Sequence, residues 1–156
     1  MNNVKKQKLT AKKDSVSPVK RKGNIKGTGR GLQKSLKKLK KKAWKVFSIW
    51  VRKSKADFNG YVACCSCGDK YLWNSGEIHA GHWIHDKLDF DERNVHPQCY
   101  KCNLKFNWKK ATTGYAIFMA RKYGVDEMDK LRKEAYIKGN NYSIQEVEEI
   151  IKKYEY

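Results

Sequence analysis

Two short stretches decide the fold of this chain: CCSCG at residues 64–68 and NVHPQCYKCN at residues 94–103. Each stretch contains one Cys-x-x-Cys pair, and the two pairs are Cys64 with Cys67 and Cys99 with Cys102. A spacer of two residues lets one tight turn aim both sulfur atoms at the same point, and four thiolates in a tetrahedron suit zinc. The sequence therefore predicts a structural zinc ion whose four positions are all filled by sulfur.

The spacing of the cysteines carries two further predictions. Thirty-one residues separate the two pairs, more than a compact zinc ribbon has, so another substructure must lie between them. Cys65 is left over and is expected to be a free thiol. Pairing Cys65 with Cys67 is the weaker alternative, because Cys-x-Cys cannot form the same turn. A redox pair or simply buried thiols are the other interpretations, but no βαβ pattern of the thioredoxin kind accompanies these cysteines.

The segment between the cysteine pairs is rich in residues that bind metals or transfer protons. EIHAGHWIH, at residues 77–85, carries three of the four histidines, and His96 is the fourth. Asn94 precedes the second cysteine pair and Asn103 directly follows it. A single histidine is more often a hydrogen-bonded structural residue, but four within eighteen positions, flanked by zinc ligands, favour a functional site.

The charge of the chain lies almost entirely at its N-terminal end. Residues 1–55 hold 20 Lys and Arg and one acid, whereas residues 56–156 hold 15 basic and 15 acidic residues. A neutral body with a cationic extension is typical of proteins that bind a polyanion, most commonly nucleic acid. A solubilising tail, an acidic protein partner and an anionic membrane surface are the alternatives. No apolar run approaches the roughly 18 residues of a membrane span, and no secretory signal is evident, so we expect a cytoplasmic protein without a membrane segment.

Composition and periodicity predict an α+β protein. Residues 1–34 have too few apolar side chains to offset the entropy of folding, and we expect a disordered basic arm there. Residues 35–156 are expected to form one domain. Its expected parts are a basic amphipathic helix at 35–55, a core with short strands at 61–110, and helices within 113–156.

These motifs resemble the zinc-containing HNH endonucleases, also called the ββα-metal or His-Me finger superfamily, and more closely the bacteriophage NinG/Rap recombination family. The likeness extends over roughly residues 36–156 and is carried by CCSCG at 64–68, AGHW at 80–83, RNVHPQC at 93–99 and CN at 102–103. It implies a zinc-stabilised ββα-metal core and Mg²⁺- or Mn²⁺-dependent cleavage of DNA, with branched or recombination-intermediate DNA as the substrate. Symmetric cleavage of a junction would suit a homodimer, and a phage-encoded protein would act in the host cytoplasm.

The resemblance also assigns roles to single residues. His82 matches the catalytic histidine, which takes a proton from the attacking water, and the imidazole pKa suits that task near neutral pH. Asn94 matches the central asparagine that braces a loop and orients the histidine. Asn103 matches the position at the helix start that supplies a ligand to the catalytic ion. Asn107, four residues later on the same helical face, is a second candidate ligand.

The strand ligand of the catalytic ion is where the motif departs from the family pattern. Gly81 stands where many HNH proteins carry an acid or a histidine directly before the catalytic histidine, and His79 is the candidate in its place. In a regular strand residues 79 and 82 point to opposite faces, so both reach one ion only through a bulge or bend at Gly81.

Basic side chains around this site are expected to contact the DNA backbone, although each alone is more often a solvated charge. They are Lys37, Lys38, Lys40, Lys41, Lys42, Lys45, Arg93, Lys105 and Lys109. Two other classes of protein remain open. A non-catalytic zinc protein that binds nucleic acid explains the cysteines and the charge, but not the histidines between them. A ribosome- or RNA-associated basic protein predicts binding without cleavage.

Overall fold

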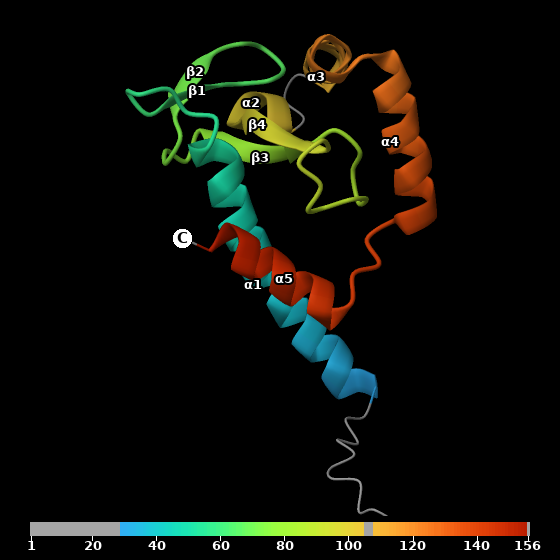
Figure 1. Ribbon diagram of the computed structural model, residues 1–156. Coiled ribbons are helices and arrows are strands. Elements are labelled where there is room, and N and C mark those ends of the chain that lie inside the picture. Colours follow the sequence, from blue (N-terminus) through green and yellow to red (C-terminus); the bar gives the residue numbers. More distant parts are fainter. Residues whose placement is uncertain (1–28, 105–107, 156) are drawn as a thin grey trace, which may run out of the picture.

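The computed structural model describes residues 29–104 and 108–155, and it confirms the α+β class (Figure 1). The elements in chain order are α1 (Gly29–Lys53), β1 (Tyr61–Ala63), β2 (Lys70–Leu72), β3 (Ile78–His82), β4 (Val95–Cys99), α2 (Tyr100–Asn103), α3 (Trp108–Tyr123), α4 (Val125–Lys138) and α5 (Ile144–Tyr154). None of the helices within this described part is long and apolar enough to cross a membrane.

The basic helix α1 begins six residues before the predicted start at Ser35. Residues 29–34, assigned from the sequence to the arm, are therefore helical, and the rest of that predicted arm lies outside the described residues. Leu, Gln, Lys and Arg are good helix formers, so the helix extends into residues that carry no apolar stripe. Across its whole length α1 carries ten basic residues and no acid.

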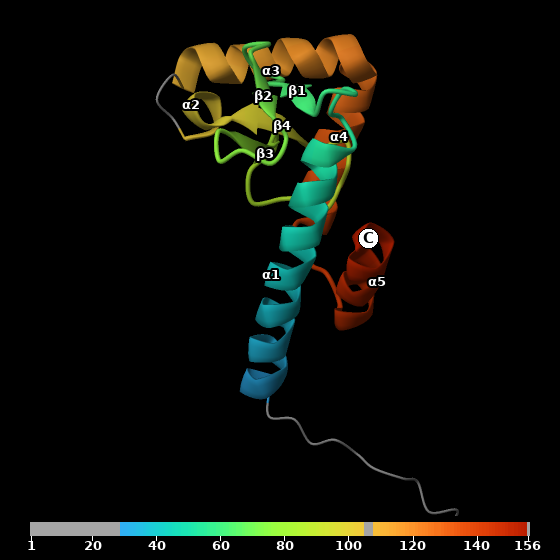
Figure 2. The ribbon, with the colours of Figure 1, turned by 90° about the vertical axis from the view of Figure 1, so that its left-hand side faces the viewer.

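The apolar stripe of α1 forms the main core together with α5 and the β3–β4 sheet. Ala43, Phe47 and Val51 are completely buried, and the ring of Tyr154 from α5 meets Phe47 edge-on at 4.9 Å between centroids. Figures 1 and 2 show α5 lying along α1, with the first turns of α1 projecting beyond it. The long basic helix is thus anchored by its second half.

Each of the two small sheets is an antiparallel pair. In the first, β1 pairs with β2, whose three residues are too few to show an alternating pattern in the sequence. In the second, β3 pairs with β4 in an unbroken register from Ile78 opposite Cys99 to His82 opposite Val95. This hairpin leads directly into α2, so it places the histidine segment beside the second cysteine pair.

The last three helices form the remaining layers. Gly124, with φ of 82°, ends α3 and lets α4 leave in a new direction (Figure 1). The helix α5 begins with a capping box, in which Ser143 Oγ accepts a hydrogen bond from Glu146 N while Ser143 N donates to the Glu146 carboxylate. Together α3 and α4 build a second apolar cluster with Leu88, Trp83 and Ile84 from the segment that follows β3.

Candidate functional site

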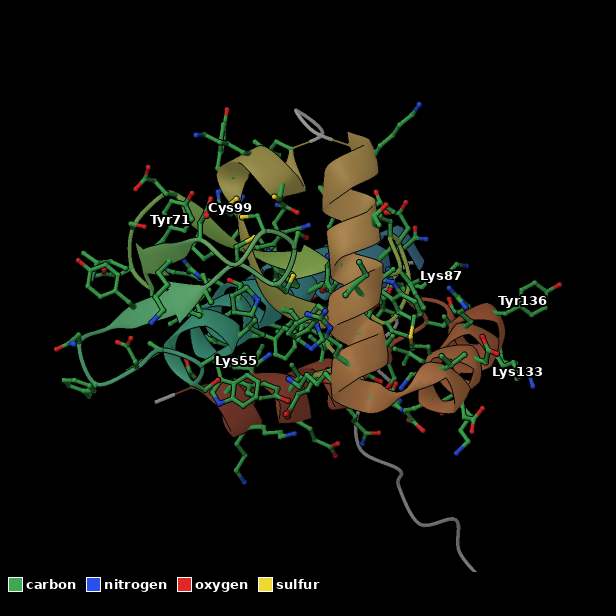
Figure 3. The ribbon with its side chains drawn as sticks, turned by 90° about the horizontal axis from the view of Figure 1, so that it is seen from above. Lys55, Tyr71, Lys87, Cys99, Lys133 and Tyr136 are labelled. Atoms are coloured by element: carbon green, nitrogen blue, oxygen red, sulfur yellow. The ribbon has the colours of Figure 1, made fainter. Side chains whose placement is uncertain are left out.

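Four cysteine sulfurs converge at the junction of the two sheets and α2. The Sγ atoms of Cys64, Cys67, Cys99 and Cys102 all lie within 4.8 Å of one another. Zn–S bonds of about 2.3 Å in a tetrahedron place sulfur pairs about 3.8 Å apart, and the Cys67 and Cys99 sulfurs are separated by 3.8 Å. Figure 3 shows Cys99 beside Tyr71 of β2 at this cluster. The geometry fits the predicted zinc site.

The protonation chemistry of the cluster also fits a bound cation. Burial opposes ionisation of Cys64, but the backbone N–H groups of Cys99, Cys67 and Ser66 outweigh it and lower the pKa of this thiol. Burial and the neighbouring thiols raise the pKa of Cys67 and bring that of Cys102 to about 12. Cys67 and Cys102 therefore resist ionisation without a cation, and a coordinated metal reverses that balance.

Cys65 stands apart from the four ligands, as predicted. It packs against the apolar cluster of α3 and α4, and its backbone N–H donates to the Pro97 carbonyl at 2.8 Å. Burial raises the pKa of its thiol, which favours the neutral form. The Cys65–Cys67 alternative is therefore wrong for this structure.

His82 lies at the end of β3 against α1. Its ring stacks on Trp44, with centroids 4.9 Å apart and planes at 15°, and its Nε2 is 3.5 Å from Asp89 Oδ1. That nitrogen is buried and has no hydrogen-bond partner among the described residues. Burial lowers the pKa of His82, and the charge of Asp89 partly opposes this effect. Sequence reasoning missed both Trp44 and Asp89 as neighbours of this histidine.

Asn94 braces the loop that follows His82. Its Oδ1 accepts from Ile84 N at 2.8 Å, and its Nδ2 donates to the carbonyls of Ile84, Lys87 and Leu88 at 3.1, 2.8 and 3.3 Å. Asp86 and Leu88 in this loop have positive φ angles of 56° and 49°, a conformation that non-glycine residues adopt only when their surroundings hold it. The fully buried asparagine supplies that support.

One cavity joins His82 to the residues after the second cysteine pair. It has a volume of about 280 Å³, and its lining includes His82, His85, Gln98 and Asn103. Residues from β3, β4, α2 and α3 therefore share a single cavity, in which several polar side chains lie on a largely apolar wall. Asn107, the second predicted ligand of the catalytic ion, lies outside the described residues.

His79 lies beside Asn103. The β3–β4 register continues through Gly81 without the expected bulge in residues 78–82, so His79 and His82 leave opposite faces of the strand. His79 Nδ1 is 3.1 Å from the Asn103 amide nitrogen, and its Nε2 is 3.2 Å from the Gly76 carbonyl. Gly81 has a different role from the predicted one, because a Cβ there would meet the Gln98 side chain lying across the strand.

The fourth histidine is structural. His96 is completely buried, and its two ring nitrogens lie 3.1 and 3.0 Å from the hydroxyls of Tyr115 and Tyr123. Burial, with smaller contributions from Lys55 and Lys122, lowers the pKa of His96 to about 2. Since this imidazole stays neutral and enclosed, it has no access to phosphate.

The predicted DNA-binding residues divide into exposed and occupied groups. Exposed side chains without an ion pair in the described part of the chain are those of Lys37, Lys38, Lys41, Lys45 and Lys109. Lys40 Nζ donates to the Asn140 carbonyl at 2.7 Å, and Lys42 pairs with Glu155 at 2.9 Å. Arg93 is held by three carboxylates, those of Asp91, Glu127 and Glu134, so a phosphate would have to compete with them. Lys105 lies outside the described residues.

The fold and the site define a class: a small α+β protein in which a four-cysteine cluster with zinc geometry fixes a hairpin beside a cavity that holds histidine and amide side chains. The chain belongs to the NinG family, because it matches the family described as "NinG: Bacteriophage Lambda NinG protein" over residues 1–156. This confirms the NinG part of the resemblance.

Curated relatives carry the same name. The chain is 27% identical to "Protein ninG" of Salmonella phage P22 over 108 residues, which cover 62% of this chain and 51% of that protein. It is 26% identical to "Protein ninG" of Escherichia phage lambda over 129 residues, covering 76% and 60% of the two chains. The matched part thus spans about half to three fifths of these relatives. No solved structure matches the chain.

Proposed function

We propose that this protein is a metal-dependent DNA endonuclease in which His82 activates the water that cleaves a phosphodiester bond. The observation that carries the proposal is the cavity shared by His82 and Asn103, together with the buried Nε2 of His82 that lacks a hydrogen-bond partner. Leaving a buried polar atom unsatisfied costs about 1–3 kcal/mol, so its persistence favours a role completed by water or substrate.

The surroundings of His82 suit a general base. Because burial lowers its pKa, the imidazole is neutral at neutral pH and has a lone pair that accepts a proton from water. Asp89, 3.5 Å from Nε2, would stabilise the imidazolium that forms. The Trp44 ring fixes the plane of the imidazole, and Asn94 holds the loop behind it.

His79 and Asn103 suit a divalent ion. Neighbouring ligands of an octahedral ion, with bonds of about 2.1 Å, lie about 3.0 Å apart, close to the 3.1 Å between His79 Nδ1 and the Asn103 amide. Rotating the amide by half a turn places Oδ1 where Nδ2 stands. Mg²⁺ or Mn²⁺ bound there would stabilise charge on the scissile phosphate and on the leaving 3′ oxygen. Asn103 connects the proposed ion site to the proposed general base, since it contacts His79 and lines the His82 cavity.

The substrate follows from charge and from the family. The exposed lysines of α1, with no acid on that helix, favour the phosphate backbone of DNA. Membership of the NinG family supports our preference for branched or recombination-intermediate DNA, the substrate implied by the resemblance. A homodimer and action in the host cytoplasm stay predictions.

The test compares His82→Ala and His85→Ala on duplex, flap and four-way-junction DNA, with Mg²⁺ or Mn²⁺ present or omitted. Both histidines line the cavity, so His85→Ala controls for loss of an imidazole there. We expect His82→Ala to lose roughly 10²- to 10⁴-fold in cleavage rate while zinc content and DNA affinity persist. Undiminished cleavage by His82→Ala would refute the role of His82. Binding by the wild type without cleavage in either ion would instead favour the non-catalytic zinc protein.

A further inference from the structure

A groove on the other flank of α1 from His82 is lined mainly by aromatic and aliphatic side chains. Its volume is about 450 Å³. Ile49 and Trp50 of α1 form one wall, Trp73 after β2 forms another, and Tyr154 closes the floor at the end of α5. The groove therefore lies between α1, the segment just after β2 and the end of α5.

The aromatic floor of this groove is held rigidly. The Trp50 ring lies 4.8 Å from that of Tyr154 and 6.1 Å from that of Phe47, in both cases between centroids. The Tyr154 hydroxyl donates to the Glu92 carboxylate at 2.6 Å. Ile49 at the rim keeps 36% of its surface exposed, which leaves an apolar edge open to solvent. A flat ligand would thus find its binding surface already formed.

The charge around the groove favours an anionic ligand. Lys53 Nζ lies 5.9 Å from the centroid of the Trp73 ring, within reach of a phosphate attached to anything that stacks there. Glu155 also lines the groove, but Lys42 pairs with it at 2.9 Å. Flat aromatic surfaces with adjacent cations are the usual means by which proteins hold unpaired nucleotides.

The groove and the His82 cavity can be reached by one DNA strand. With 3.6 residues per turn, Trp44, which stacks on His82, and Ile49 at the groove rim are separated by about 140° around α1. The exposed side chains Lys41 and Lys45 lie in the arc between them on the solvent side of the helix. A DNA backbone that crosses these lysines has the His82 cavity on one side and the groove on the other.

We propose that the groove between Trp50 and Trp73 stacks an unpaired base of the DNA whose backbone crosses α1. The inference rests on the proposed function for the identity of the nucleic acid, and it extends that function by a site for a single-stranded segment next to the cleaved strand. Paired bases in a duplex are stacked on their neighbours and do not enter the groove.

The test measures binding of a fluorescent oligothymidine and of a duplex of equal length, without divalent ions, by the full chain. Ile49→Asp places a carboxylate at the rim, and Trp73→Ala removes the stacking ring. Ile137→Asp makes the same charge change on α4, where the side chain is 81% exposed and does not line the groove. We expect the groove variants to lose roughly 5- to 100-fold in affinity for oligothymidine and little for duplex, while Ile137→Asp matches the wild type.

Thermal melting and zinc content establish whether each variant is folded. If Trp73→Ala does not fold, Ile49→Asp alone tests the groove. Equal losses on single-stranded and duplex DNA, or no loss on either, would overturn the inference. A change in the oligomeric state of Ile49→Asp with unchanged affinity would identify the groove as a contact between copies and would also overturn it. This assay measures binding alone, so its result does not depend on cleavage. The nuclease proposal fails separately, if the wild-type chain binds DNA but does not cleave it when Mg²⁺ or Mn²⁺ is present.

Discussion

Replacing Asn94 by alanine is the most direct test of how the site is held together. The substitution removes one hydrogen bond accepted from Ile84 N and three donated to backbone carbonyls, all in the loop that follows His82. Each buried backbone group left without a partner costs about 1–3 kcal/mol, and water entering the void recovers part of this. We expect a loss of about 3–5 kcal/mol in the free energy of unfolding.

The measurement is urea denaturation together with thermal melting. For a chain of this size each kcal/mol lowers the melting temperature by about 2–4 °C, so Asn94→Ala should melt roughly 6–20 °C lower. Asn140→Ala is the matched control, because its Oδ1 accepts only one hydrogen bond from the same loop, from Asp89 N at 3.0 Å. That control should lose about 1 kcal/mol. Equal losses in the two variants would show that Asn94 does not support the loop.

A second variant at this position tests the direction of the hydrogen bonds. Asn94→Asp keeps the acceptor for Ile84 N but turns the three donated bonds into contacts between a carboxylate oxygen and carbonyls. The new carboxyl should therefore have a pKa in the folded state above its unfolded value of about 3.9. Stability relative to wild type should then rise as the pH falls through the folded pKa, because the protonated carboxyl can donate again. A difference in the free energy of unfolding between Asn94→Asp and wild type that does not change with pH would contradict this reasoning.

Three further outcomes follow from the metal cluster, the N-terminal segment and the buried histidine. Cys99→Ser should lose the zinc ion and unfold the core, whereas Cys65→Ser should keep one zinc per chain, as metal analysis and circular dichroism will show. Deleting residues 1–28 should leave α1 and the melting temperature intact and flatten the salt dependence of DNA binding by about 0.9 for each phosphate that the segment neutralises; an unchanged slope would exclude the segment from binding. His96 has a folded pKa of about 2 against about 6.5 unfolded, so the unfolded chain binds the extra proton and stability should fall by about 1.4 kcal/mol per pH unit below 6.5. His96→Phe should lack this slope.

Local signals in the sequence were sufficient for several elements. The Ser143–Glu146 pair marks the start of α5, and Gly124 marks the end of α3, because each depends on a few adjacent residues. The four zinc ligands follow from spacing alone, since two Cys-x-x-Cys turns have few other uses.

The surroundings of His82 could not be predicted in the same way. Trp44 reaches it from a helix 38 positions earlier in the chain, and Asp89 reaches it only because the loop after β3 folds back. Neither contact leaves a periodic or spacing signal. The role of Gly81 is hidden for a related reason, because the side chain that requires its small size, Gln98, belongs to the neighbouring strand.

The β3–β4 ladder has a consequence for how the chain responds to oxidants. Cys99 pairs with Ile78 at one end of the ladder and His82 pairs with Val95 at the other, about 14 Å away at 3.4 Å per residue. An oxidised or alkylated thiol would eject the metal and release the anchored end of both strands. The strand that carries the imidazole would then lose its support, so modification of Cys99 at one end of the ladder would disturb the cavity at the other end through the backbone.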